Sequence, residues 1–216
     1  MNDLNIKKIA TDGISYLKKL EGSDLYFGID HCGDDLYEAK ELFDGKHRLD
    51  HNRLVFVSYP EGEISEPLIA SHGQYFADPV FDEGYIFILK ADFGLKKLYI
   101  YRSDQKFRRV TEHISLDMDE KEDCYNMRLT KYPLTLIKTS KEQVFQILWP
   151  LRSGFQIGPH ESFDHRIDEY LIFSEWFEDP DYREEAVIRR YPDGEKLWSH
   201  KGSILTMDDG QEWLIG

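Results

Sequence analysis

The segment Tyr59-Pro60-Glu61-Gly62-Glu63 decides the fold, because it returns 132 residues later as Tyr191-Pro192-Asp193-Gly194-Glu195. Each copy follows an apolar segment typical of a β-strand, at 55–59 and 187–191, and precedes a second short strand. Proline restricts φ and glycine accepts a positive φ, which suits the tight turn of a hairpin. The two copies therefore predict two equivalent β-hairpins.

Two weaker echoes lie between these copies, at 98–110 and 145–157, and each combines a strand, a polar turn and a second strand. The first strands of the four hairpins end at aromatic residues spaced by 42, 48 and 42 residues: Tyr59, Tyr101, Trp149 and Tyr191. A period of about 40 to 50 residues with about four short strands per unit is typical of a β-propeller blade. The alternative is a chance similarity of turns in another all-β or mixed fold.

Further apolar segments complete the repeat, because one lies upstream of each later hairpin, at 85–89, 134–137 and 170–173. The terminal segments 14–29 and 204–215 are predicted to form one last blade, which closes the ring by pairing the first and last strands. We therefore predict an all-β fold, a small β-propeller-like repeat of about four or five blades of short antiparallel strands. No Ser/Gly/Pro-rich linker divides the chain, so residues 1–216 are predicted to form a single domain.

One segment differs from this pattern, because residues 35–44 are typical of a short helix. Asp35 and Glu38 resemble a capping pair, and Gly45 stands where a helix often ends in a left-handed residue. Four apolar residues fall on one face: Leu36, Ala39, Leu42 and Phe43. We expect this helix either to decorate one blade or to indicate an α+β fold.

The charge balance disfavours nucleic acid and anionic membranes as partners. The 216 residues include 27 basic and 41 acidic ones, a net charge of −14, whereas phosphate binding needs concentrated Lys and Arg. No apolar run approaches the roughly 20 residues that cross a bilayer, and the N-terminus has no apolar signal region. Cys32 and Cys124 form no C-x-x-C pair, so both are predicted to be reduced in a cytoplasmic protein.

Familiar catalytic and metal-binding motifs are absent from the sequence. There is no P-loop, no G-x-G-x-x-G after a strand and no G-x-S-x-G elbow, and we expect no cofactor. His160 and His165 are five residues apart, so on a helix they could not share a metal as i, i+4 ligands do. His47 and His51 have the i, i+4 spacing but lie in a loop-like stretch. The acidic run 117–123 lacks the pattern of a calcium loop. The sequence predicts no metal site.

The stretch 72–87, which contains Asp78-Pro79 and the turn Asp82-Glu83-Gly84, resembles a blade of family 43-type glycoside hydrolases. The similarity extends through a strand and polar turn at 98–104 and covers roughly 35 residues. The resemblance implies that Asp78 would be the general base that activates water. An inverting mechanism needs a second carboxyl group about 6.5–9.5 Å away. Glu175 is the candidate acid, because its apolar neighbours would raise its pKa. The alternative is structural, with Asp78-Pro79 beginning a strand after a turn.

Aromatic residues offer candidate binding groups. The four tryptophans could contact a ligand or a partner protein, but aromatics at regular positions in blades usually belong to the core. The densest cluster is Phe173, Trp176 and Phe177, followed by an acidic stretch at 178–185 that contains Tyr182. We predict that Trp176, Asp78 and Tyr182 bind ligand.

The predicted function is that of a non-catalytic module that binds a protein or a small polar ligand. Two alternatives stay open. A glycoside hydrolase-like enzyme, or its inactive relative, would use Asp78 as general base. An acidic inhibitor or immunity-type protein would bind a basic partner through a continuous acidic surface.

Overall fold

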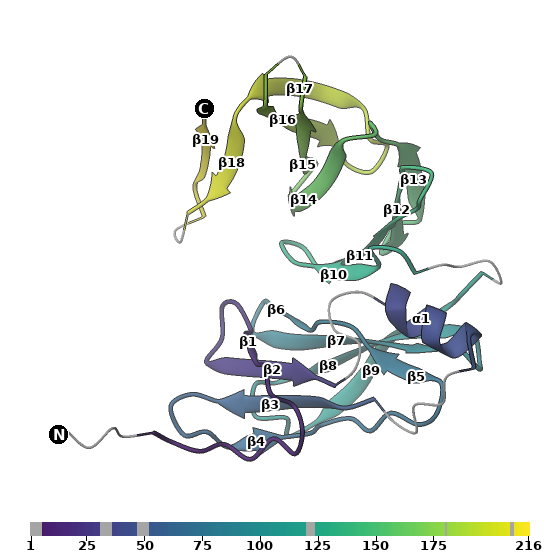
Figure 1. Cartoon of the computed structure of the whole chain (residues 1–216), viewed down its shortest axis with the longest axis vertical. Coiled ribbons are helices and arrows are strands. Elements are labelled where there is room, and N and C mark those ends of the chain that lie inside the picture. Colours follow the sequence, from purple (N-terminus) through teal and green to yellow (C-terminus); the bar gives the residue numbers. More distant parts are fainter. Residues whose placement is uncertain (1–5, 31–35, 47–51, 120–123, 180, 208–209) are drawn as a thin grey trace. The chain divides into compact units, whose positions relative to one another are not determined.

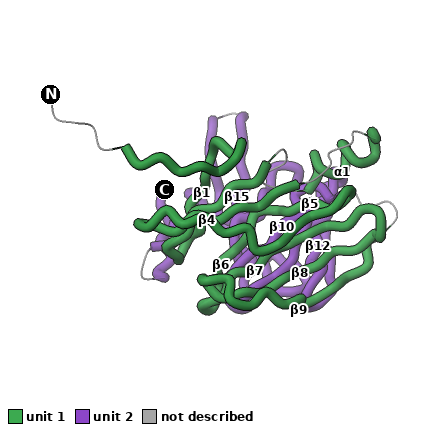
Figure 2. The backbone as a smooth tube through the Cα atoms, turned by 90° about the horizontal axis from the view of Figure 1, so that it is seen from below, with its two compact units in different colours: residues 1–122 green, residues 123–216 purple. Residues whose placement is uncertain are grey.

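The computed structural model describes residues 6–30, 36–46, 52–119, 124–179, 181–207 and 210–216. The chain divides into two compact units, unit 1 from Met1 to Glu122 and unit 2 from Asp123 to Gly216 (Figure 2). Each unit is described by itself below. The prediction of one domain, 1–216, stays a prediction.

The described residues of unit 1 form two antiparallel sheets and one helix (Figure 1). The first sheet has the order β1-β2-β3-β4, with strands β1 Lys18–Lys19, β2 Leu25–Ile29, β3 Leu54–Ser58 and β4 Ile64–Ser65. The second sheet has the order β5-β7-β8-β9, with β6 paired to β7 beside β5. Its strands are β5 Gln74–Phe76, β6 Val80–Asp82, β7 Tyr85–Asp92, β8 Lys97–Ser103 and β9 Val110–Asp117.

Unit 2 contains two four-stranded antiparallel sheets and one two-stranded sheet. The third sheet of the chain consists of β10 Arg128–Thr130, β11 Thr135–Thr139, β12 Val144–Trp149 and β13 Ser153–Gln156. The fourth consists of β14 Glu161–Ile167, β15 Tyr170–Phe177, β16 Arg183–Arg190 and β17 Lys196–Lys201. The strands β18 Ser203–Thr206 and β19 Glu212–Ile215 pair with each other. With 51% of the residues in strands and 4% in helix, the all-β prediction is confirmed.

The four predicted hairpins occupy equivalent places in these sheets. They are β3–β4, β8–β9, β12–β13 and β16–β17, the third and fourth strands of each sheet's main path. The predicted upstream strands are β7, β11 and β15, each the second strand of that path. Every four-stranded sheet therefore follows chain order with antiparallel neighbours.

The two copies of the pentapeptide form the same turn. Three backbone hydrogen bonds are equivalent in the two copies. In unit 1, the N–H groups of Ser58, Tyr59 and Gly62 donate to the carbonyl oxygens of Glu63, Asp24 and Ser58, respectively. In unit 2, the N–H groups of Arg190, Tyr191 and Gly194 donate to those of Glu195, Glu169 and Arg190. The six N···O distances lie between 2.7 and 2.9 Å. Gly62 and Gly194 have φ of 70° and 74°, which a residue with a Cβ adopts at a cost.

Each unit buries an apolar core between its sheets. In unit 1, Phe27 and Phe56 of the first sheet pack with Phe76 and Ile88 of the second. In unit 2, one core joins the third and fourth sheets through Phe145, Ile147, Phe163, Phe173 and Val187. Alternate residues of each strand supply these contacts, because successive side chains of a strand point to opposite faces.

The predicted helix is present as α1, Tyr37–Asp44, and ends at Asp44 as predicted, but its predicted caps are wrong. Leu36 is the N-cap and no side chain caps the helix, while Asp35 lies outside the described residues. Gly45 has φ of −71°, and the following Lys46 takes the positive φ of 56°. The backbone therefore continues one residue further before it turns left-handed.

The predicted blade shared by the two terminal segments stays a prediction, because the segments belong to different units. Among the described residues, β1 and β2 belong to the first sheet with β3 and β4, whereas β18 and β19 pair with each other. No closed ring is detected among these residues, so the number of blades stays a prediction.

Candidate functional site

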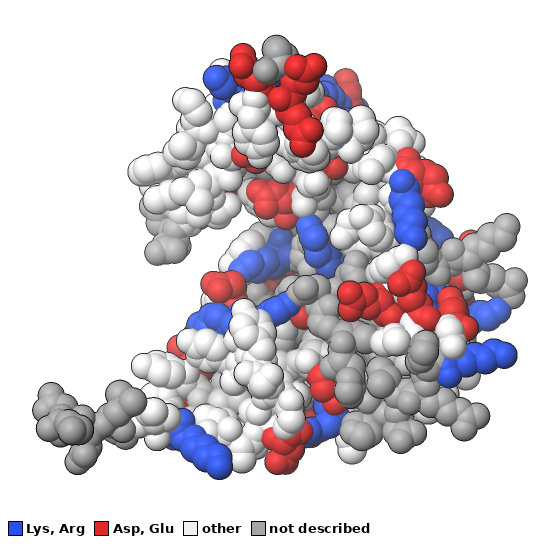
Figure 3. All heavy atoms as spheres, viewed as in Figure 1, with Lys and Arg blue, Asp and Glu red and all other residues white. Residues whose placement is uncertain are grey.

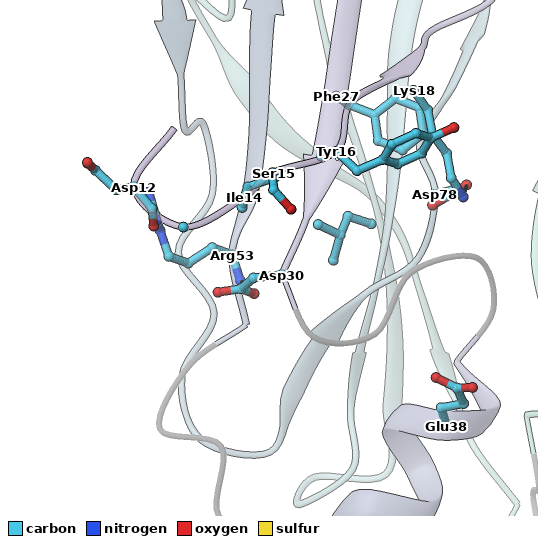
Figure 4. Close-up of a pocket in the computed structure, with 13 residues that line it drawn as sticks. Asp12, Ile14, Ser15, Tyr16, Lys18, Phe27, Asp30, Glu38, Arg53 and Asp78 are labelled. Carbon is cyan, nitrogen blue, oxygen red and sulfur yellow. Dashed lines mark hydrogen bonds and ion pairs between the residues drawn. The ribbon is translucent and has the colours of Figure 1, made fainter. Parts of the chain in front are cut away.

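Unit 1 contains a cavity of about 750 Å³ at one end of its first sheet. The segment before β1 provides Asp12 to Tyr16 of its wall, and β2 provides Phe27 to Ile29. Asp30, Arg53 and Asp78 add charged groups, and Glu38 lies on α1 (Figure 4). The wall thus combines carboxylates, cations and aromatic rings, which can position a polar ligand.

Asp78 lies in this cavity on the short segment between β5 and β6. Its Oδ2 is 2.9 Å from Nζ of Lys18, and both side chains are about one third exposed. Figure 4 shows the two groups pointing toward each other. The predicted turn after Asp82 is also present, with positive φ at Glu83 and Gly84 between β6 and β7. Asp78 therefore presents an ion pair at the cavity wall rather than a carboxylate held in a hairpin.

Arg53 and Asp30 form the other charged side of the cavity. The Arg53 guanidinium donates to Oε1 and Oε2 of Glu66 at 3.1 and 2.9 Å, and to the carbonyl oxygen of Asp12 at 3.1 Å. The hydrogen bond to Glu66 raises the pKa of Arg53 and outweighs the opposing effect of burial. Oδ1 of Asp30 accepts from the backbone N–H of Arg53 and from Nδ2 of Asn52. Both groups are therefore held in place without a ligand.

Gly28 lets the N-terminal segment lie directly on β2. A Cβ at this position would be 2.5 Å from Cγ2 of Ile14, 2.8 Å from the carbonyl oxygen of Tyr16 and 2.9 Å from Cδ2 of Leu17. Any other residue would push the segment away from the sheet. The cavity wall thus depends on the absence of a side chain at Gly28.

Trp176 lies in unit 2, at a second cavity of about 240 Å³. Its ring meets the His160 ring edge-on, with centroids 4.8 Å apart. Glu175 does not line the unit 1 cavity, and its Oε2 is 3.4 Å from Nζ of Lys196. Tyr182 is 78% exposed and lines neither cavity. The structure thus places Asp78 in unit 1 and the other predicted site residues in unit 2.

A buried ion pair supports the unit 2 cavity. Both Oε atoms of Glu161 accept from Arg189, at 2.9 and 2.7 Å, and the Glu161 side chain is only 2% exposed. Nη1 of Arg189 also donates to the carbonyl oxygen of Gly194 at 2.8 Å. A Cβ at Gly158 would be 3.1 Å from Glu175 and 3.3 Å from Glu161, so this turn passes between two carboxylates. No local sequence pattern indicates this network, because Glu161 and Arg189 are 28 residues apart and lie on different strands.

Three of the four tryptophans lie outside the core. Trp176, Trp198 and Trp213 are between 37% and 48% exposed, whereas the core of unit 2 consists of phenylalanine and aliphatic side chains. Phe173 is buried as expected. The acidic stretch at 178–185 ends within a strand, because β16 begins at Arg183.

His165 connects β14 to the hairpin β18–β19. Its Nδ1 is 3.3 Å from Oδ2 of Asp164, and its Nε2 is 3.5 Å from Oε2 of Glu212 and 3.4 Å from Oγ1 of Thr206. Burial of the imidazole opposes protonation, but Asp164 and Glu212 together outweigh it and raise the pKa of His165. The protonated ring therefore holds the hairpin more firmly than the neutral ring does.

We expect this contact to make the stability of unit 2 depend on pH. A raised folded-state pKa stabilises the fold below the ordinary histidine pKa, and the stabilisation disappears as pH rises through the folded-state pKa. Urea unfolding at pH 6 and pH 8 should show a larger loss of stability in the wild type than in His165→Gln. His200→Gln, at an exposed histidine of the same unit, should behave like the wild type. Equal pH dependence of wild type and His165→Gln would contradict this expectation.

The described part of the chain contains no group of three or more His, Cys, Asp and Glu side chains suited to a metal ion. His160 directly precedes β14 and His165 lies within it, so neither is on a helix. His47, His51, Cys32 and the end of the acidic run, 120–123, lie outside the described residues. Cys124 is buried, and its redox state stays a prediction. Within the described residues, no helix is long and apolar enough to cross a membrane.

Comparison with known proteins adds no assignment to these cavities. No protein-family model matches the chain, and no curated protein matches it.

Proposed function

We propose that the chain is a non-catalytic binding module of β-propeller-like architecture, in which the unit 1 cavity holds a small polar ligand. The observation that carries the proposal is this cavity, whose volume of about 750 Å³ lies in the range of small-molecule sites. The Lys18–Asp78 ion pair can exchange its partners for polar groups of a ligand, and Tyr16 and Phe27 offer apolar contact.

The propeller part of the proposal is supported by the repeated sheets. Successive blades are four-stranded antiparallel sheets that pack face to face. In unit 2, the turn of the fourth sheet lies on the third sheet, where Oγ of Ser153 donates to the carbonyl oxygen of Pro192 at 2.7 Å. In unit 1, Nζ of Lys7 donates to the equivalent carbonyl of Pro60 at 3.1 Å. The N-terminal segment thus contacts the β3–β4 turn of the first sheet, as β13 contacts the β16–β17 turn of the fourth sheet.

Binding can be tested by recording amide NMR spectra with D-glucose, L-arginine and uridine as probes of three ligand classes. We expect at least one probe to shift the signals of Ser15, Gly28 and Asp30 in a saturable way. Asp78→Asn should weaken that binding at least about tenfold, because it removes a charged partner. Asp24→Asn, at an exposed aspartate of the same unit outside the cavity, should leave the affinity unchanged. If no probe shifts these signals, the proposed site is wrong.

A glycoside hydrolase-like activity is the second candidate, because the cavity brings Asp78 together with Asp30 and Glu38. Aryl glycosides test it directly. Hydrolysis by the wild type that is lost in Asp78→Asn and kept in Asp24→Asn would replace the binding proposal with the enzymatic one.

The inhibitor alternative needs a continuous acidic surface. Lys and Arg side chains are interspersed with Asp and Glu over the face shown in Figure 3. That face offers no support for an acidic surface that binds a basic partner.

A further inference from the structure

The cavity of unit 2 has its own chemistry, separate from the cavity of unit 1. It is lined by residues of the third and fourth sheets and of the segments beside them, including the almost completely buried Ile137 and Phe163. Trp176 of β15 and His160 form an aromatic side of the wall. This aromatic side favours a ligand with one apolar face.

The polar part of the wall consists mainly of uncharged groups. Amides, hydroxyls and a phenol line it, on Asn126, Gln143, Thr139, Ser162 and Tyr125. Such groups both donate and accept hydrogen bonds, as the hydroxyl groups of a ligand also do.

The charged groups at this cavity already have hydrogen-bond partners within the protein. Nε and Nη2 of Arg189 donate to the two carboxylate oxygens of Glu161. Nη2 of Arg128 donates to the carbonyl oxygen of Phe163 at 2.9 Å. Because the Glu161 carboxylate already has its counter-ion, it gives no electrostatic advantage to a cationic ligand.

The volume sets the size of the ligand. About 240 Å³ is below the usual range of about 300–1,000 Å³ for drug-sized sites, so the cavity accommodates one ring rather than a chain of rings.

From these observations we infer that the unit 2 cavity binds a single uncharged, hydroxyl-bearing ring, a pyranose unit, with its apolar face against Trp176. The C–H bonds of a pyranose gather on one face and its hydroxyl groups surround the ring. This matches an aromatic side chain bordered by neutral donors and acceptors. The site would take either a free monosaccharide or the terminal unit of a longer glycan.

The test is a titration of the full chain with methyl β-D-glucopyranoside, methyl β-D-galactopyranoside and methyl β-D-xylopyranoside, followed by saturation-transfer NMR. We expect saturable binding of at least one of them. Trp176→Ala should weaken it about tenfold or more, through loss of the aromatic contact. Trp198→Ala is the matched control, because Trp198 is 39% exposed against 37% for Trp176 and lines neither cavity. It should retain the wild-type affinity.

Three results would overturn the inference. The first is that none of the three pyranosides binds in a saturable way. The second is that Trp176→Ala and Trp198→Ala weaken pyranoside binding equally, because this result indicates adsorption to exposed tryptophan. Loss of pyranoside binding in Asp78→Asn would move the site to unit 1. Far-UV circular dichroism and urea unfolding show whether Trp176→Ala is folded. If it is not, Gln143→Ala replaces it, with the same expected weakening.

A trisaccharide that ends in the pyranose that binds best separates the two sources of ligand. Tighter binding of the trisaccharide indicates a glycan terminus, and tighter binding of the methyl pyranoside indicates a free sugar. Either order of affinity supports the site. Because the pyranoside test uses Trp176 and the unit 1 test uses Asp78, either proposal can fail while the other stands.

Discussion

Replacing Arg189 with methionine is expected to lower the free energy of unfolding of unit 2 by about 3–5 kcal/mol. The Glu161 carboxylate is almost completely buried, and Arg189 bonds to both of its oxygens. Without the guanidinium, a buried negative charge would lack its counter-ion, and the carbonyl of Gly194 would lose a donor. Urea unfolding followed by tryptophan fluorescence measures this effect in unit 2, because all four tryptophans lie in it.

The neighbouring Arg190 provides the control. It pairs with Asp193 and Glu195 at the surface, on the opposite face of β16. We expect little loss from Arg190→Met, because exposed ion pairs contribute little. The double variant Glu161→Gln/Arg189→Met should recover more than half of the loss, since the glutamine is neutral and keeps an oxygen for the N–H of Gly158. A cost for Arg189→Met no larger than that of Arg190→Met would refute the role of the buried pair.

Gly194→Ala is expected to destabilise unit 2 by about 2–5 kcal/mol. Two effects contribute, because alanine would be strained in the left-handed backbone conformation and its Cβ would overlap a neighbouring side chain. Gly194 has φ of 74°, and a Cβ would be 2.1 Å from Cγ of Phe155. Phe155 lies on β13 of the preceding sheet, so the overlap separates two packed sheets. The same fluorescence-detected urea unfolding measures the loss.

Gly210→Ala separates the two contributions. Gly210 has φ of 83° and nothing within 4 Å of its Cβ position, so we expect only the backbone cost of about 1–2 kcal/mol. In a double-mutant cycle, Phe155→Ala should reduce the cost of Gly194→Ala, because it removes the ring that the new Cβ meets. Equal costs for the two glycine variants, or additivity with Phe155→Ala, would contradict this explanation.

The candidate site was predictable only in part. Asp78 was singled out because the stretch around Asp78-Pro79 resembles a glycoside hydrolase blade, and the structure places it at a cavity. Its partner Lys18 could not be identified, because the two are 60 residues apart and no local pattern connects them. Glu175 was chosen for its apolar neighbours in the sequence, but the structure pairs it with Lys196, which comes from another strand.

The local chemistry of the sequence by itself determined the strands, the hairpins and the repeated turn. Proline, glycine and alternating apolar residues act over a few neighbouring positions, so Tyr59–Glu63 and Tyr191–Glu195 form the same hydrogen bonds in different surroundings. Only the tertiary structure decided what each turn packs against. Gly62 faces the flexible ends of Ile9 and Lys7, whereas Gly194 faces the ring of Phe155. The charged partners, the segment over Gly28 and both cavities likewise depend on contacts between distant residues, which follow from how the sheets pack rather than from any local pattern.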